Sequence, residues 1–187
     1  MQTIKEMIEE SADVKKKVVQ LTPQIEKASK IVEKALSKGN KVILAGNGGS
    51  SSQASHIAAE FTGRYKKERR SLPSIALSSE MSAVTAIGND YGYDFVFSRQ
   101  MEGLGSKGDV FIALSTSGNS INLIKALEVA KKKGITTISL IGKDGGKMKG
   151  KADLDIIIPS ENTPRIQESH LMVLHIMCEL VEEAMFP

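Results

Sequence analysis

The sequence has few cysteines, no long apolar run and no signal-peptide stretch, and each of these absences excludes a class of protein. It has a single cysteine, Cys178, so no intrachain disulfide can form, and this usage fits a reducing compartment. No apolar run approaches the ~18 residues that a membrane-spanning helix needs, and the first residues lack the apolar stretch of a signal peptide. We therefore expect a cytoplasmic protein with no membrane partner.

Net charge is also low, and it is concentrated in one segment. Lysine and arginine number 25 against 22 aspartate and glutamate residues, which leaves a balance of +3. Segment 64–70 (RYKKERR) carries five positive charges and one negative charge, so the remainder of the chain is close to neutral. Tyr65 is the only aromatic residue in this segment and no recognition motif accompanies it, so we expect no nucleic-acid partner.

The 187 residues have the length and composition of one globular domain. Residues 1–37 carry apolar side chains at helical spacing and predict an N-terminal helical segment. We expect a break within it, with Thr22 as the N-cap of a second helix and Pro23 in its first position. Residues 38–187 change to short apolar runs that alternate with helical stretches, the pattern of a doubly wound α/β core.

Five of these runs predict strands, and because they are continuously apolar we expect the strands to be buried on both faces of a sheet. The runs span residues 41–45, 74–77, 109–114, 135–141 and 154–159. Helices are expected over about 51–61, 81–88, 95–103, 119–133 and 163–185. This alternation predicts an α/β fold of three layers, an αβα sandwich in which helices flank both faces of a parallel sheet.

Two loops that would follow strands are rich in glycine and in hydroxyl side chains. Asn47, Gly48 and Gly49 lie in GNGGS (46–50), and the second loop, STSGNS, spans 115–120. Each precedes an expected helix, where free N–H groups and the helix dipole favour an anion such as phosphate. A tight turn explains the first loop equally well, and capping explains part of the second. Two such loops at one edge of a sheet favour a phosphate site.

Two pairs of polar residues have the spacing of metal ligands. His56 and Glu60 are four residues apart on an expected helix, and they share one of its faces. Gln167 and His175 share a face of the last helix. Together these nitrogen and oxygen donors suit a borderline divalent metal such as zinc. Spacing leaves open whether the two helices meet, and a local pair or a structural histidine is the alternative at each position.

Five segments, in order along the chain, carry a resemblance to a known family. They are GNGGS (46–50), HIAAEFTGRYKKER (56–69), AIGNDYGYDFVFSRQ (86–100), STSGNS (115–120) and TPRIQESH (163–170). In these segments the chain resembles the phosphoheptose isomerases, the sedoheptulose 7-phosphate isomerase branch of the sugar-isomerase (SIS) domain family. The resemblance implies a single SIS domain over residues 1–187, a five-stranded parallel sheet, and a homotetramer with active sites at subunit interfaces.

The resemblance also implies roles for individual residues. One zinc ion per subunit would be held by His56, Glu60, Gln167 and His175. Glu60 and His175 also match the acid/base pair of the family. Gln167 and a further set of residues match positions that contact the sugar phosphate, namely Asn47, Gly48, Gly49, Arg64, Asn89, Asp90, Ser115, Thr116, Ser117 and Ser120.

The implied reaction turns D-sedoheptulose 7-phosphate into D-glycero-D-manno-heptose 7-phosphate through an enediol. This is the first step of ADP-heptose synthesis for lipopolysaccharide or another surface polysaccharide. Gln53 and Asn162 depart from the family pattern, which commonly has acids there, and this bears on proton handling and substrate preference. Two other hypotheses stay open: a non-enzymatic SIS-domain tetramer that binds the bacterial replication initiator, and a sugar-phosphate-sensing module. The acid at Glu60 and the imidazole at His175 favour the isomerase.

Overall fold

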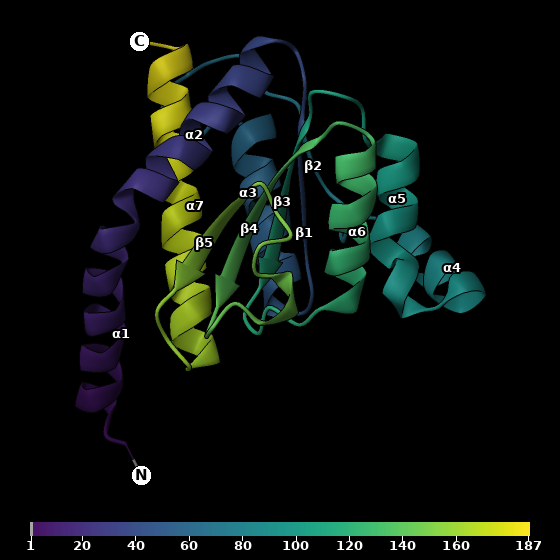
Figure 1. Cartoon of the computed structure of the whole chain (residues 1–187). Helices are drawn as coiled ribbons and strands as arrows, with labels where there is room; N and C mark the ends of the chain where they lie inside the picture. The colour runs from purple at the N-terminus through teal and green to yellow at the C-terminus, as the bar shows by residue number, and fades with distance from the viewer. Residues whose placement is uncertain (1) are drawn as a thin grey trace.

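The five apolar runs form one parallel sheet in the computed structural model, which describes residues 2–187 (Figure 1). The strands are β1 (Val42–Gly46), β2 (Ser74–Ala76), β3 (Val110–Ser115), β4 (Thr136–Gly142) and β5 (Leu154–Ile158). Their order in the sheet is β2-β1-β3-β4-β5, and all neighbouring strands are parallel. Each expected strand is confirmed, with its ends within one residue of those predicted.

Helices connect the strands, as the alternating pattern predicts. They are α1 (Ile4–Val18), α2 (Thr22–Ser37), α3 (Gly49–Thr62), α4 (Met81–Tyr91), α5 (Val96–Leu104), α6 (Ile121–Lys132) and α7 (Thr163–Met185), with short 3-10 turns η1 (Val19–Leu21), η2 (Tyr93–Phe95) and η3 (Gly146–Met148). No helix within residues 2–187 combines the length and the hydropathy that crossing a membrane would require.

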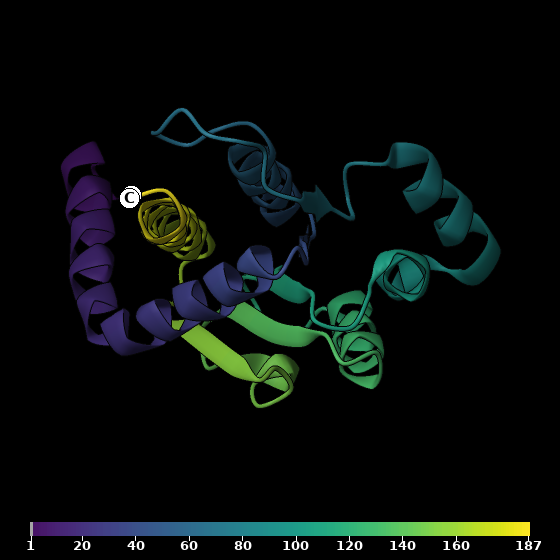
Figure 2. The ribbon, with the colours of Figure 1, turned by 90° about the horizontal axis from the view of Figure 1, so that it is seen from above.

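Alternate side chains of the central strands face opposite layers of helices, which produces the three layers seen in Figure 2. In β1, Val42 and Leu44 pack in one core with α2, α3 and α7. Ile43 and Ala45 point the other way and pack with α5 and α6. Because both faces of the strand are covered, successive residues are apolar rather than alternating. The predicted αβα class is confirmed.

The break in the N-terminal helical segment is present, but its capping differs from the prediction. The 3-10 turn η1 joins α1 to α2, and Leu21 occupies the N-cap position of α2. Thr22 is already helical, and its hydroxyl donates to the backbone oxygen of Val19 instead of accepting from the helix. Pro23 lies in the first turn, where a missing N–H costs nothing.

Polar contacts attach α1 to the beginning of α7. The side-chain amide of Asn162 donates to the carboxylate of Glu10 at 3.0 and 3.1 Å. The hydroxyl of Ser11 donates to Glu168 at 2.6 Å. An acid in place of Asn162 would meet the like charge of Glu10, so the amide at this position has a structural role.

The connection between α3 and β2, residues 63–73, is organised around one buried ion pair. Nε of Arg69 lies 2.8 Å from Oε1 of Glu182, and these side chains are only 2% and 3% exposed. The same carboxylate accepts hydrogen bonds from the backbone N–H groups of Tyr65, Lys66 and Lys67. Burial by itself raises the pKa of Glu182, but these N–H donors and Arg69 outweigh it and hold the pKa below its usual value.

The guanidinium of Arg69 also satisfies carbonyl groups at the end of α3. It donates to the backbone oxygens of Glu60, Phe61 and Gly63 at 2.8, 3.0 and 3.1 Å. The last carbonyls of a helix lack hydrogen-bond donors within the helix, and the N–H groups of Arg69 serve as those donors at the end of α3. Through Glu182, the same contacts tie the end of α3 to α7.

His170 is fully buried on α7, and within residues 2–187 neither of its ring nitrogens has a hydrogen-bond partner. Burial lowers its pKa to about 4, although the nearby backbone of Ile141 acts in the opposite direction. The imidazole is therefore neutral at pH 7 and belongs to the core.

Replacing Glu182 by glutamine should destabilise the fold, because it leaves the guanidinium of Arg69 buried without a counter-charge. We expect the free energy of unfolding to fall by about 3–5 kcal/mol in urea denaturation. Glu183→Gln, on the exposed side of the same helix, is the matched control and should change it by less than about 0.5 kcal/mol. Equal effects of the two substitutions would contradict the role assigned to the ion pair.

Acidification should destabilise the protein through His170. The unfolded chain takes up a proton at this residue near pH 6.5 and the native protein only near pH 4, so stability is lost as the pH falls through that window. Between pH 7 and pH 5 the loss should be about 2 kcal/mol. Urea denaturation of the unmodified protein and of His170→Gln at both pH values isolates this group, since other titrating groups are common to both. An identical pH dependence would rule out a neutral buried imidazole.

Candidate functional site

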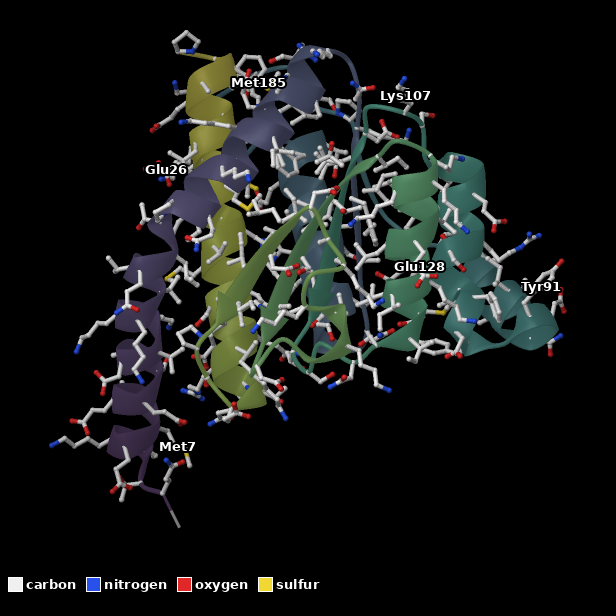
Figure 3. All side chains as sticks on the ribbon, viewed as in Figure 1. Met7, Glu26, Tyr91, Lys107, Glu128 and Met185 are labelled. Atoms are coloured by element: carbon white, nitrogen blue, oxygen red, sulfur yellow. The ribbon has the colours of Figure 1, made fainter. Side chains whose placement is uncertain are left out.

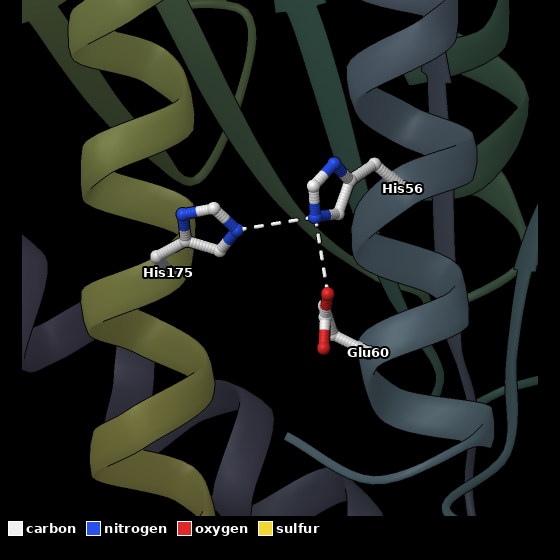
Figure 4. Close-up of side chains that lie close together, drawn as sticks. All are labelled: His56, Glu60 and His175. Atoms are coloured by element: carbon white, nitrogen blue, oxygen red, sulfur yellow. Dashed lines mark hydrogen bonds and ion pairs between the residues drawn. The ribbon is translucent and has the colours of Figure 1, made fainter. Parts of the chain in front are cut away.

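His56, Glu60 and His175 meet in the space between α3 and α7 (Figure 4). His56 and Glu60 lie one helical turn apart on α3, and α7 brings His175 to the same place from the other end of the chain. Nε2 of His56 is 3.0 Å from Oε1 of Glu60 and 3.3 Å from Nε2 of His175. One ligand atom from each residue lies within 4.8 Å of the other two. The two helices therefore meet at the predicted residues, which we call the triad.

Helix periodicity explains why these side chains face one another. On α3, Ile57 and Phe61 are buried against the sheet, which leaves residues 56 and 60 on the outer part of the helix. On α7, Val173 and Leu174 are buried in the same core. The two helices therefore lie side by side on one face of the sheet, and polar side chains gather along the line where they meet.

Nε2 of His56 can form a linear hydrogen bond to only one of its two close neighbours. Nε2 of His56 carries at most one proton, yet it faces Glu60 and a second imidazole nitrogen at hydrogen-bond distance. A cation between the three donors would satisfy all of them. Two nitrogens bound to one tetrahedral zinc ion at ~2.0–2.1 Å lie about 3.3 Å apart, which matches the separation of the two Nε2 atoms. The donor set fits a divalent metal ion.

The triad is partly open to solvent, with 45% of the His56 side chain and 25% of the Glu60 side chain exposed. Partial burial is the main influence on the pKa of His175 and lowers it, and His56 lowers it further, against the opposing effect of Glu60. The imidazole of His175 is therefore neutral near pH 7, the form that ligates a metal or accepts a proton.

Gln167 lies two helical turns before His175 and is placed beside the glycine-rich loop. Its side-chain amide packs so closely on Gly49 that a Cβ there would come within 2.7 Å of the amide nitrogen. Within the part of the chain that the structure describes, no hydrogen bond joins this amide to the triad. The assignment of Gln167 as a fourth metal ligand stays a prediction.

Gln53, one of the two departures from the family pattern, holds α3 against α7. Its side-chain nitrogen donates to the backbone oxygen of Gln167 at 2.7 Å, and the side chain is almost completely buried. Asn162 bonds Glu10 at the other end of the same region. Both amides therefore have structural partners.

The two glycine- and serine-rich loops follow β1 and β3, which are neighbours in the centre of the sheet. In the order β2-β1-β3-β4-β5, β2 is added on one side of β1 and β3 on the other, and ligands of parallel sheets bind at such a switch point. The prediction that both loops lie at one edge of the sheet is confirmed.

Asn47, in the first loop, is held by two side chains from other elements. It exchanges hydrogen bonds with Asn122 of α6 at 3.1 and 2.9 Å. Its Oδ1 also accepts a hydrogen bond from the hydroxyl of Tyr93 at 2.9 Å. Neither Asn122 nor Tyr93 was predicted as a site residue. The available signal was a polar residue, Asn122, between the apolar residues Ile121 and Leu123 of an expected helix.

The second loop is a hydrogen-bonded turn directly before α6. The hydroxyl of Ser115 accepts from the N–H of Gly118 at 3.1 Å and lies 3.0 Å from the hydroxyl of Ser120. The hydroxyl of Ser117 accepts from the following backbone at 3.2 Å, and Thr116 is half-buried beside it. Ser120 is the N-cap of α6, yet its side chain makes no capping hydrogen bond. The N–H of Leu123 is bonded by Asn122, and the N–H groups of Ile121 and Asn122 remain available to an anion.

The remaining predicted contacts with the sugar phosphate are exposed residues outside the triad. Asn89 and Asp90 are exposed on α4 and bond one another, and α4 packs on the opposite face of the sheet from α3 and α7. Tyr91, at the end of α4, points away from the sheet (Figure 3). Arg64 is exposed and lies 3.7 Å from Glu68.

Comparison with known proteins agrees with the fold. A family model for the SIS domain matches residues 6–142, well over half of the chain. A phosphoheptose isomerase from Sulfurimonas denitrificans is 53% identical over 186 residues, which cover 98% of this chain and 95% of the relative.

Solved structures show the same similarity. A phosphoheptose isomerase from Francisella tularensis superposes with a TM-score of 0.93 at 32% identity, over 96% of each chain. One from Neisseria gonorrhoeae has a TM-score of 0.89 at 38% identity, over 97% of this chain and 100% of the other.

The triad should bind one divalent transition-metal ion per chain. In titrations of metal-free protein with Co²⁺, followed by its visible absorption, we expect His175→Ala to weaken binding by more than the ~10–100-fold that loss of an outer partner costs. Glu68→Gln, an exposed acid outside the triad, should leave the titration unchanged. Binding to His175→Ala with unaltered affinity would exclude the triad as the metal site. Gln167→Ala, tested alongside, decides whether that amide is a fourth ligand.

Proposed function

The chain belongs to the SIS-domain family and, within it, to the phosphoheptose isomerases, and from this premise we propose that it converts D-sedoheptulose 7-phosphate to D-glycero-D-manno-heptose 7-phosphate. The observation that carries the proposal is the meeting of one carboxylate with two imidazoles between α3 and α7. An aldose–ketose isomerase needs a base for a carbon-bound proton and a group that moves protons between oxygens. The triad contains both.

We assign the carbon-bound proton to Glu60. The reaction moves one proton from C1 to C2, so a single carboxylate can remove it from C1, leaving a cis-enediol, and return it to C2 on the same face. The side chain is 25% exposed, so a substrate can reach it. Its helix is tied to α7 by Arg69, which accounts for a defined position of the carboxylate.

His175 is assigned the protons on oxygen. Its neutral imidazole can accept the proton of the C1 hydroxyl and deliver one to the oxygen on C2, so that the ketose carbonyl becomes a hydroxyl and the aldehyde forms at C1. The lowered pKa of this residue supports the role, since the neutral form predominates near pH 7. His56 contacts both Glu60 and His175 and so helps to fix their relative positions.

His56, Glu60 and His175, with Gln167 as the fourth ligand, would hold one zinc ion per subunit. When bound, zinc would polarise the substrate carbonyl and stabilise negative charge on the enediol oxygens. The matching separation of the two imidazole nitrogens supports this assignment.

The phosphate of the substrate would lie against loop 115–120, at the far end of the sugar from C1. Ser115, Thr116, Ser117 and Ser120 supply hydroxyl groups there, and α6 supplies free N–H groups. Asn47, Gly48 and Gly49 would contact the sugar between the two ends. Binding energy from the phosphate holds C1 and C2 against the base, where it counts toward catalysis.

We further propose that one SIS domain spans residues 1–187 and that four copies assemble in the cytoplasm, with sites at subunit interfaces. Asn89, Asp90 and Arg64 would then reach the site of a neighbouring subunit. The complete lack of buried residues on α4 supports this, as does the exposure of Met81 and Tyr91 at its two ends. The product would enter ADP-heptose synthesis for a surface polysaccharide.

The non-enzymatic hypotheses lose their main support. Gln53 and Asn162 kept a sensing module open, and both have structural partners outside the triad. A protein that only binds the replication initiator or a sugar phosphate has no need of an acid/base pair at a metal-type site.

Glu60→Gln should fold and bind sugar phosphate but fail to turn it over, because an amide cannot accept the carbon-bound proton. We expect at least a ~10²-fold loss of kcat, which is the lower end of what general acid–base catalysis contributes. Incubation with sedoheptulose 7-phosphate, followed by NMR for the aldoheptose phosphate, measures it. Glu68→Gln is the control and should retain full activity. Near-normal turnover by Glu60→Gln would exclude this residue as the base. Absence of turnover by the unmodified protein with any divalent metal would contradict the proposed isomerase function.

A further inference from the structure

The imidazole of His175 lies between two other rings. The ring of His56 approaches it edge-on, with centroids 5.1 Å apart and an interplanar angle of 63°. The ring of Tyr65 stacks on it at 5.8 Å and 25°. Tyr65 belongs to the basic segment and lies outside the triad, so the stack is a contact that the proposed chemistry leaves unused.

Tyr65 is held in place by the buried ion pair rather than by its own hydroxyl. Its backbone N–H donates to Oε1 of Glu182 at 3.1 Å, and Arg69 binds the same oxygen. Within residues 2–187 the phenol hydroxyl makes no hydrogen bond. The contribution of the side chain is therefore its flat ring, which packs against the core beside α7.

One guanidinium links both ends of this arrangement. Arg69 donates to the backbone oxygen of Glu60 at 2.8 Å and to the carboxylate that holds the backbone of Tyr65. Any shift of the segment would therefore move the stacking ring and the backbone of the base together. Lys66, next to Tyr65, forms an ion pair within the chain, because its Nζ lies 2.6 Å from Oε1 of Glu179.

A histidine ring that passes protons between two oxygens has to keep a defined plane. The torsion that rotates the ring has a broad preference and does not by itself define the plane of the imidazole. His175 is only partly buried and forms no hydrogen bond through Nδ1 within the described residues. A ring stacked on one face removes the freedom to rotate, and small misplacements of a reacting group are costly.

We propose that Tyr65 is a positioning residue that fixes the plane of the His175 imidazole for proton transfer, with the Arg69–Glu182 pair holding it there. This role rests on the proposed isomerase function. Because the flat ring acts and the hydroxyl does not, phenylalanine should replace tyrosine and an aliphatic residue should not.

The test compares Tyr65→Phe with Tyr65→Leu by kinetics and by NMR of histidine-labelled, metal-free protein. For Tyr65→Leu we expect kcat to fall about three- to tenfold with KM within twofold, which corresponds to the usual worth of one aromatic pair. The ring protons of His175, assigned by their loss in His175→Gln, should change their chemical shifts, because the ring current of Tyr65 is removed and the imidazole is free to rotate. Tyr65→Phe should keep both the rate and the shifts.

Lys67→Ala is the matched control, because it changes the same segment, and among the described residues its side chain bonds the backbone oxygen of Phe186 alone. It should leave kcat and the ring-proton shifts unchanged. If Tyr65→Leu does not fold, Tyr65→Met takes its place with the same expected results.

Full kcat in Tyr65→Leu, or an equal loss in Tyr65→Phe, would overturn the proposal. Unchanged His175 shifts in Tyr65→Leu would overturn it as well, even if the rate falls. An unmodified protein without isomerase activity would instead count against the function, while the NMR comparison would still decide whether Tyr65 holds the ring.

Discussion

The buried ion pair between Arg69 and Glu182 is the contact on which the geometry of the site depends. A charge this far from solvent is costly unless it is paired and hydrogen-bonded, so the two groups are stable only together. Glu182 gathers the backbone N–H groups of the segment after α3, and Arg69 binds the carbonyls at the end of α3. This mutual requirement defines how the end of α3 lies on α7, and the triad occupies the line between those two helices.

Several polar groups that suggest chemistry in the sequence turn out to hold the fold together. Part of the positive charge of segment 64–70 is paired within the chain: Lys66 pairs with Glu179, and the buried Arg69 pairs with Glu182. Gln53 and Asn162, which stand where relatives commonly have acids, bond a backbone carbonyl and Glu10. The residues available for catalysis are thus fewer than the sequence suggests, and they are concentrated at one helix–helix junction.

How much could be predicted follows from the range of each interaction. The strands were found to within one residue because the central strands are covered on both faces and are therefore mostly apolar, although β4 contains threonine and serine and the edge strand β2 is only partly buried. His56 and Glu60 could be paired because helix spacing is a local property. The stack of Tyr65 on His175 joins residues 110 positions apart in the sequence, and Asn47 and Asn122 are 75 positions apart. No local sequence pattern predicts either contact. The capping of α2 was missed because Thr22 bonds back to the preceding turn.

The sequence by itself determined the parallel sheet, its two helical layers and the kinds of side chain available to a site, since these depend on periodicity and composition. It left open whether α3 and α7 meet, which ring stacks on His175, and where the side chain of Arg69 lies. Only the tertiary structure decided these points. The reason is physical: the position of a side chain in the site is set by burial and by pairing with groups distant in the chain, and those partners come together only when the helices pack on the sheet.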